Sequence, residues 1–179
     1  MSDAVNSFER GIRDADALLE MFDQAKGTPE AANAEVLKRA ALVIAVAAWE
    51  TYLKARIREE FANWLRAVDG SSVGKFIQRK LDEDLKRFFN PNSERTKRLF
   101  MDYFEVDVTK EWIWGNYDSA AATKALDNLI RKRGDAAHQA NTSPHPSAVP
   151  HSVKREELEK GIRFLRGLVA RMEKIKIAR

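Results

Sequence analysis

A stretch from about residue 30 to residue 68 constrains the fold most, because apolar side chains recur there with helical spacing and no proline interrupts them. The large apolar residues fall three or four positions apart, which places them along one face of an α-helix. This face consists of Leu42, Val46, Trp49, Leu53, Ile57, Phe61, Trp64 and Val68. At a rise of 1.5 Å per residue such a helix is roughly 60 Å long, longer than a compact domain of 179 residues needs. We therefore expect an elongated bundle with one long central helix.

The rest of the chain also follows helical spacing, so the predicted fold class is all-α. Helical patterns run over residues 8–22, 73–89 and 94–104, onward from 118 or 119, and over residues 158–175. Residues 105–117 are expected to be irregular, with Trp112 and Trp114 closing one end of the bundle. Three prolines predict a loop over residues 139–152. We expect an up-and-down bundle of about five or six helices that forms one domain over residues 1–179.

The composition excludes several classes of site. Cysteine is absent, which rules out disulfide bridges, thiolate metal sites, iron–sulfur clusters and cysteine nucleophiles. The longest strongly apolar run, residues 40–49, is about half as long as a membrane-spanning helix requires. Residues 1–4 show neither the basic nor the apolar region of an export signal. We therefore expect a cytoplasmic protein that does not enter a membrane.

Basic residues gather at the C-terminal end of the chain. Residues 153–179 carry nine basic and four acidic side chains, a net charge of +5, whereas the whole chain carries +4. A one-sided basic helix is a possible contact surface for a polyanion such as RNA. A solvated helix face gives the same pattern, and charge alone favours this second interpretation.

Most known catalytic motifs are missing from the sequence. It contains no glycine-rich phosphate loop, no His-Glu zinc motif on a helix and no nucleophile elbow. Three histidines remain, His138, His145 and His151, and the last two fall in the predicted proline-rich loop. A site of three histidines could bind a metal ion, but nothing in the sequence orients their rings. We expect neither a metal ion nor a cofactor.

Arg133 stands out because it falls inside an apolar stripe. At about 100° per residue, Leu126, Leu129, Ile130 and Ala137 share its face of the predicted helix. An unpaired buried charge costs several kcal/mol. The guanidinium must therefore reach solvent, pair with a carboxylate, or face an interface that brings an anion. Glu50, beside Trp49 on the long helix, is a candidate partner.

His138 follows Arg133 by five positions, about 140° around an ideal helix. One straight helix would not direct both side chains at one substrate, although Gly134 could allow a bend and the helix could end just before His138. Arg131 lies seven positions before His138 and almost eclipses it. Asp135, three positions before His138, could orient or charge the imidazole. From geometry alone, either arginine could serve in a site.

These residues carry a resemblance to a known family. Residues 133–138 read Arg-Gly-Asp-Ala-Ala-His after a Leu-x-x-Leu-Ile run, which resembles the Arg-x4-6-His signature of HEPN domains. Residues 47–52, Ala-Ala-Trp-Glu-Thr-Tyr, resemble the second core helix of stand-alone bacterial HEPN proteins of the RiboL-PSP type, and residues 90–95 are similar too. The resemblance covers about residues 30–140. HEPN domains are small helical bundles, and many are metal-independent endoribonucleases.

The resemblance implies an active site shared across a homodimer, in which the Arg and His of both subunits line one cleft. Arg133 would hold the scissile phosphate. His138 would act as general base or acid while the ribose 2′-OH attacks phosphorus, so DNA would not be cleaved. Asp135 and Glu50 are the expected supporting residues. Arg131 and Lys132 are expected to contact RNA, and a toxin or phage-defence role would add an antitoxin or regulatory protein as a partner.

One departure from the family pattern keeps alternatives open. Many family members have a polar residue directly after the arginine, whereas this chain has Gly134 there and its acid one position later. Some HEPN domains lack catalysis and serve as RNA-binding or dimerisation modules, which is the main alternative. A helical adaptor that docks a partner protein is the third hypothesis.

Overall fold

The computed structural model describes residues 2–25, 31–142 and 153–177, without the side chains of residues 31–33, 67 and 137–142. Within these ranges every regular element is a helix, apart from one isolated bridge between Trp114 and Tyr117. The six α-helices of the described ranges are α1 (Asp3–Ala25), α2 (Ala31–Leu65), α3 (Ser72–Lys86), α4 (Ser93–Phe104), α5 (Ser119–Thr142) and α6 (Arg155–Met172). Two short 3-10 helices, η1 (Arg66–Val68) and η2 (Val108–Glu111), join them. The all-α prediction is confirmed. No helix in the described ranges combines the length and the apolar character that a membrane span requires.

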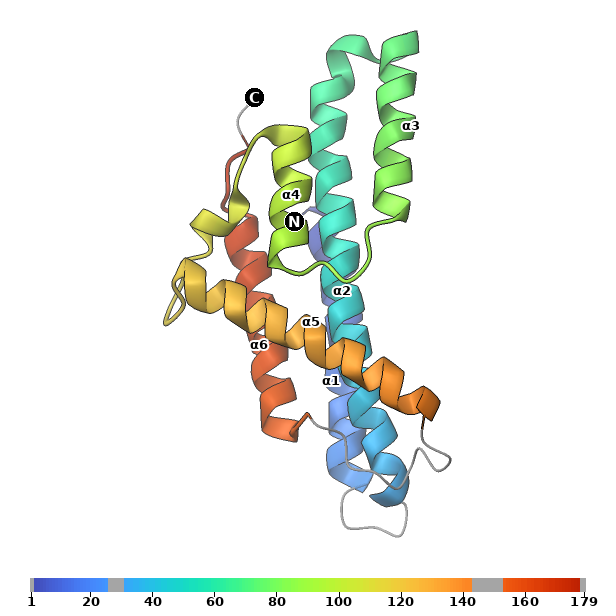
Figure 1. The fold of residues 1–179 in the computed structure, drawn as a ribbon, viewed down its shortest axis with the longest axis vertical. Coiled ribbons are helices and arrows are strands. Elements are labelled where there is room, and N and C mark those ends of the chain that lie inside the picture. The colour runs from blue at the N-terminus through green and yellow to red at the C-terminus, as the bar shows by residue number, and fades with distance from the viewer. Residues whose placement is uncertain (1, 26–30, 143–152, 178–179) are drawn as a thin grey trace.

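The long helix α2 forms an antiparallel hairpin with α1 (Figure 1). Its 35 residues extend for about 52 Å. The two helices approach closely, since a Cβ atom at Gly11 would lie 2.9 Å from Cβ of Ala48. The start of α1 reaches Glu59 of α2, whose Oε1 accepts a hydrogen bond from the Ala4 N–H at 2.8 Å. Beyond that point α2 loses the cover of α1, and Trp64, the last but one residue of the predicted apolar face, is 44% exposed.

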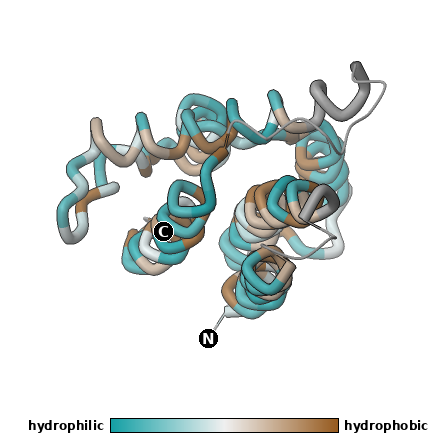
Figure 2. The backbone as a smooth tube through the Cα atoms, turned by 90° about the horizontal axis from the view of Figure 1, so that it is seen from below, coloured by the Kyte–Doolittle hydropathy of each residue, from teal (hydrophilic) through white to brown (hydrophobic). Residues whose placement is uncertain are grey.

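Helix α5 departs from the expected up-and-down arrangement. It runs across α2 and α6, whereas the other helices follow the long axis of the molecule (Figure 1). Viewed along that axis, α5 lies on one side of the bundle and the other helices are seen nearly end-on (Figure 2). Its buried face carries Ala122, Leu126, Leu129 and Ala136. The crossing brings the C-terminal half of α5 over the middle of α2.

Three helix boundaries differ from the sequence prediction. Helix α3 ends at Lys86 and not near Phe89, because the chain turns there and Pro91 disfavours helix at the preceding residue. Helix α5 continues through Thr142, four residues into the segment predicted as a loop over 139–152, and residues 143–152 lie outside the described part. Helix α6 ends at Met172, yet Ile175 beyond it is still buried, at 8% exposure.

The irregular segment before α5 packs into the bundle as expected. Trp112 is fully buried, and its Nε1 donates to the sulfur of Met172 at 3.2 Å. Trp114 stacks on Tyr117, with ring centroids 5.0 Å apart, and also contacts Phe164 of α6. These aromatic contacts join the segment between α4 and α5 to α6.

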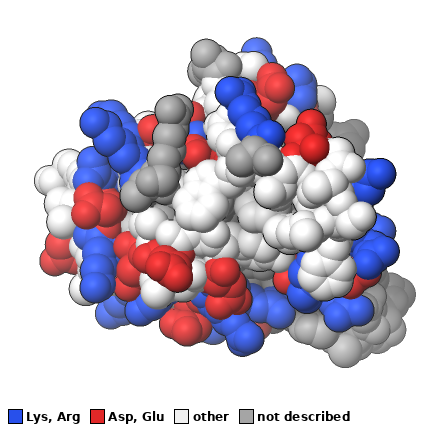
Figure 3. All heavy atoms as spheres, turned by 90° about the horizontal axis from the view of Figure 1, so that it is seen from above, with Lys and Arg blue, Asp and Glu red and all other residues white. Residues whose placement is uncertain are grey.

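Most basic side chains of α6 form ion pairs within the fold. Arg155 pairs with Asp23 at 2.8 Å, and Arg166 pairs with Asp16, so both arginines tie α6 to α1. Arg171 pairs with Glu111 of η2 at 2.8 Å. These pairs make a polyanion surface along α6 weaker than its net charge suggests. Seen from above, acidic and basic side chains are interspersed around an uncharged centre (Figure 3).

Candidate functional site

Arg133 lies on the buried stripe of α5, as the sequence predicted. Leu129 and Ala136 are buried beside it, and Arg133 itself is partly buried. Its Nη1 donates to Oδ1 of Asn90 at 2.8 Å. In the part of the chain that the structure describes, its buried Nε has no hydrogen-bond partner. The guanidinium is thus held at one nitrogen while another donor is unsatisfied, which costs about 1–3 kcal/mol for a buried polar group.

Asn90 belongs to the short connection between α3 and α4, and its backbone is held by α2. It adopts a left-handed conformation with φ of 51°, which Asn tolerates better than most residues. Its N–H donates to Oε2 of Glu50 at 3.2 Å. Nε1 of Trp49 donates to the carbonyl of Pro91 at 3.0 Å. The Trp-Glu pair of α2 therefore holds the backbone of this connection.

Helix α5 holds the same connection from the other side. The carboxylate of Asp127 accepts hydrogen bonds from the N–H and the hydroxyl of Ser93, at 2.8 and 2.9 Å. Asn92 caps α4 by accepting from the N–H of Arg95 at 2.9 Å. Together with the Arg133–Asn90 bond, these contacts give the connection fixed anchors on both α2 and α5.

Glu50 does not pair directly with Arg133, which corrects the expected contact. Its Oε1 forms an ion pair with Nζ of Lys54 at 2.7 Å, and its Oε2 accepts from the backbone of Asn90. The link between Glu50 and Arg133 therefore runs through Asn90. Sequence reasoning did not assign a role in the site to Asn90, and the only signal was an Asn before a proline between two helical patterns.

Phe89 adds an exposed aromatic ring to this cluster. Its side chain is 55% exposed, whereas Phe88 before it is buried. Nζ of Lys54 lies over the ring, 5.0 Å from the centroid. The guanidinium of Arg95 donates to the carbonyl of Phe89. The connection thus combines an aromatic surface with nearby cations, a combination suited to binding an anion that carries flat rings.

The expected RNA contacts on α5 do not all lie with Arg133. Lys132 points to α6 and pairs with Glu157 at 2.7 Å; this hydrogen bond, together with one from the Lys154 N–H, lowers the pKa of Glu157 below its ordinary value. Arg131 is exposed, and its Nη2 donates to Asn128 at 3.2 Å. Asp135 is exposed as well.

His138 lies on α5, but its side chain is outside the described part of the structure. The helix is continuous from Ser119 to Thr142, so it does not end just before His138, which was one of the two alternatives that the sequence left open. In a continuous helix the positions of Arg133 and His138 are about 140° apart. His145 and His151 also lie outside the described residues.

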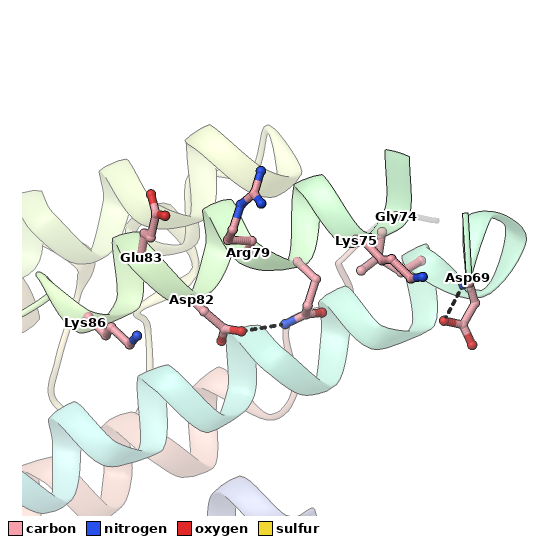
Figure 4. A pocket seen from close by; sticks show the side chains of 10 residues that line it. Asp69, Gly74, Lys75, Arg79, Asp82, Glu83 and Lys86 are labelled. Carbon is pink, nitrogen blue, oxygen red and sulfur yellow. Dashed lines mark hydrogen bonds between the residues drawn. The ribbon is translucent and has the colours of Figure 1, made fainter. Parts of the chain in front are cut away.

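The described residues form no group placed to hold a metal ion, and an open groove lies elsewhere on the surface. No group of three or more His, Asp or Glu side chains in the described ranges is placed to hold a metal ion. An open groove of about 610 Å³ runs between the end of α2 and α3, away from Arg133 (Figure 4). Its charged lining residues are of both signs: Lys75, Arg79, Lys86, Asp69, Asp82 and Glu83. This balance gives the groove no preference for an anion or a cation.

Nearly the whole chain is similar to one protein family. The model of the RiboL-PSP-HEPN family matches residues 10–175, nearly the whole chain. The match includes the Trp-Glu pair of α2, the connection around Asn90 and the C-terminal half of α5. No curated protein and no solved structure matches the chain significantly. The chain therefore belongs to the RiboL-PSP-HEPN family.

Proposed function

We propose that this protein is a metal-independent endoribonuclease in which Arg133 binds the scissile phosphate and His138 transfers protons. The observation that carries the proposal is the half-satisfied guanidinium of Arg133, with Nη1 on Asn90 and Nε without a partner in the described part of the chain. A residue selected only for stability would have its buried donors paired. An arginine that is oriented but incompletely paired is suited to stabilising charge that develops during a reaction.

In the proposed reaction the RNA supplies its own nucleophile. His138 accepts the proton of the ribose 2′-OH, and the 2′-oxygen forms a bond to the adjacent phosphorus. The bond from phosphorus to the 5′-oxygen breaks, and that oxygen takes up the proton that His138 accepted, directly or through water, which returns His138 to its starting state. The products are a cyclic phosphate and a free 5′-OH end. Arg133 stabilises the negative charge on the phosphate oxygens in the transition state.

The active unit is proposed to be a homodimer. Helix α5 is continuous across Gly134, so one chain directs the positions of Arg133 and His138 to different sides. A two-fold contact presents each residue twice and can bring Arg133 of one copy near His138 of the other.

The flanking charges of α5 have unequal parts in this proposal. Arg131 is exposed, with a hydrogen bond to Asn128 on its own helix, and is proposed to contact RNA, whereas Lys132 forms an ion pair with Glu157. Asp135 precedes His138 by three positions and is proposed to orient its ring. Glu50 acts indirectly: it accepts a hydrogen bond from the backbone of Asn90, and the side chain of Asn90 holds Arg133. A toxin or phage-defence role, controlled by an antitoxin or regulatory protein, is the biological setting that we propose from the family.

The test is cleavage of mixed single-stranded RNA in excess EDTA. We expect cleavage that Arg133→Ala and His138→Ala abolish and that the control His145→Ala preserves, with no cleavage of DNA of the same sequence. Light scattering should give a dimer at micromolar concentration. Cleavage that requires a divalent metal, or that survives His138→Ala, would refute the proposed mechanism.

A catalytically inactive RNA-binding module is the second candidate, and the observation that favours it is Gly134. A Cβ atom built at this position meets nothing within 4 Å, so packing does not require glycine there. The polar residue that many family members carry after the arginine would therefore have room in this chain. RNA binding that weakens with salt, without cleavage, would support this candidate.

A further inference from the structure

Phe89 is an exposed aromatic side chain whose position the core does not explain. Phe88, its neighbour, is 8% exposed and packs into the core, whereas Phe89 is 55% exposed. An isolated exposed apolar residue needs no explanation. This one, however, is next to Asn90, the residue that holds the guanidinium of Arg133.

The backbone around Phe89 is held in place. Its carbonyl accepts from the guanidinium of Arg95. The next N–H, that of Asn90, donates to Glu50, and the carbonyl of Pro91 accepts from Trp49. A ring on such a backbone presents its surface with little loss of conformational freedom when a ligand binds.

A cation accompanies the ring. Nζ of Lys54 lies over one face of the ring, 5.0 Å from the centroid, and also pairs with Glu50, so its place is fixed from α2 and a base would stack on the opposite face. Proteins that bind single-stranded nucleic acid combine aromatic side chains, on which bases stack, with cations that contact the backbone. Phe89, Lys54 and Arg133 supply these groups around one connection.

We propose that Phe89 is a stacking platform for an unpaired base of the RNA strand whose phosphate Arg133 holds. The inference rests on the proposed function, and it names the substrate as single-stranded RNA. Asn90 joins the two groups: its backbone follows that of Phe89, and its side chain accepts from Arg133. A base paired within a duplex cannot expose its face to the ring, so duplex RNA should bind more weakly.

The chain contains a matched control for Phe89. Phe76 on α3 is 59% exposed, and Cζ of Arg79 lies 5.7 Å from its ring centroid. Exposure, ring type and a neighbouring cation are therefore nearly the same at both positions. Phe76 differs in lying outside the connection that contacts Arg133.

The experiment measures binding without cleavage. Labelled single-stranded RNA with 2′-O-methyl riboses is titrated with the full-length chain in EDTA, and fluorescence anisotropy gives Kd. We expect Phe89→Ala to weaken binding about tenfold, Phe89→Trp to retain it, and Phe76→Ala to leave it unchanged. A second RNA carries abasic sites in place of its bases. The unsubstituted chain should bind this RNA about tenfold more weakly than intact RNA. The Phe89→Ala chain should bind both RNAs with the same Kd.

Other outcomes separate this inference from the proposed function. Equal Kd values for the unsubstituted chain and Phe89→Ala would overturn the platform, and so would a Phe89→Ala chain that becomes monomeric by light scattering. If Phe89→Ala weakens binding while the unsubstituted chain cleaves no RNA, the platform stands and the nuclease function fails. If Arg133→Ala abolishes cleavage while Phe89→Ala changes neither binding nor cleavage, the nuclease function stands and the platform fails.

Discussion

Substitution of Asn90 separates two contributions that the structure assigns to one residue. Its side chain accepts a hydrogen bond from Arg133 at 2.8 Å, and its backbone is left-handed, with φ of 51°. Asn90→Gly removes the acceptor but suits the backbone, whereas Asn90→Ala removes the acceptor and adds strain. Asn90→Asp keeps an acceptor and tolerates the conformation, so it is the matched control.

The expected loss follows from these contacts. A hydrogen bond to a charged group contributes about 1.5–3 kcal/mol to stability, and partial exposure of Arg133 lets water replace part of it. We therefore expect Asn90→Gly to lower the free energy of unfolding by about 1–2 kcal/mol. Strain in Asn90→Ala should add about 1 kcal/mol more, and Asn90→Asp should stay near the unsubstituted chain.

Urea unfolding followed by circular dichroism measures these differences from the midpoint and the slope. Cleavage of RNA should fall in Asn90→Gly, because the guanidinium of Arg133 loses its fixed orientation, and it should be kept in Asn90→Asp. If Asn90→Gly and the unsubstituted chain unfold at the same urea concentration, the hydrogen bond does not hold Arg133 and the reasoning fails.

Three further predictions concern other parts of the chain. Gly134→Ala and Gly134→Asn should both raise the melting temperature, because glycine disfavours helix and a side chain has room at this position. If the missing polar group limits catalysis, only Gly134→Asn should also raise the cleavage rate. Equal cleavage rates for the two variants would show that the polar group does not limit catalysis. Burial raises the pKa of Asp107, but the hydrogen bond from Thr109 and the ammonium of Lys97 lower it more, so it lies below its ordinary 3.8. Its stabilising effect is present above about pH 4 and is lost as pH falls through the lowered pKa, so urea midpoints should drop there, and less steeply in Asp107→Asn. Burial also raises the pKa of Tyr52 above its ordinary 10.0, with a neighbouring carboxylate adding to the effect. Stability should therefore fall as pH rises above about 10, and Tyr52→Phe, which has no proton to lose, should show a flatter profile over the same range.

The sequence predicted well those features that depend on residues close together in the chain. The apolar face of α2 needs only the spacing from Leu42 to Phe61, and all of these residues are buried in the structure. Arg133 was recognisable because a charge inside an apolar stripe is visible within about three turns of one helix. Its partner was not, since Asn90 lies 43 positions away and meets Arg133 only because α5 crosses the bundle.

The crossing of α5 is a tertiary feature that helical spacing does not encode. A stripe of apolar residues shows which side of a helix is buried, but it does not give the angle at which the helix packs. The end of α3 was misplaced for a related reason. Phe88 and Phe89 continue the apolar pattern, yet one is buried and the other is exposed after the chain turns.

The uneven cover along α2 has a consequence for amide hydrogen exchange. Trp49 and Tyr52 are fully buried where α1 lies against the helix, whereas Trp64 beyond its start is 44% exposed. Backbone amides near Trp64 should therefore exchange with deuterium faster than those near Trp49, since local opening there exposes less apolar surface. Glu50 lies in the part of the helix where we expect slow exchange, so the end of α2 near Trp64 should open locally while the contacts that hold Asn90 stay formed.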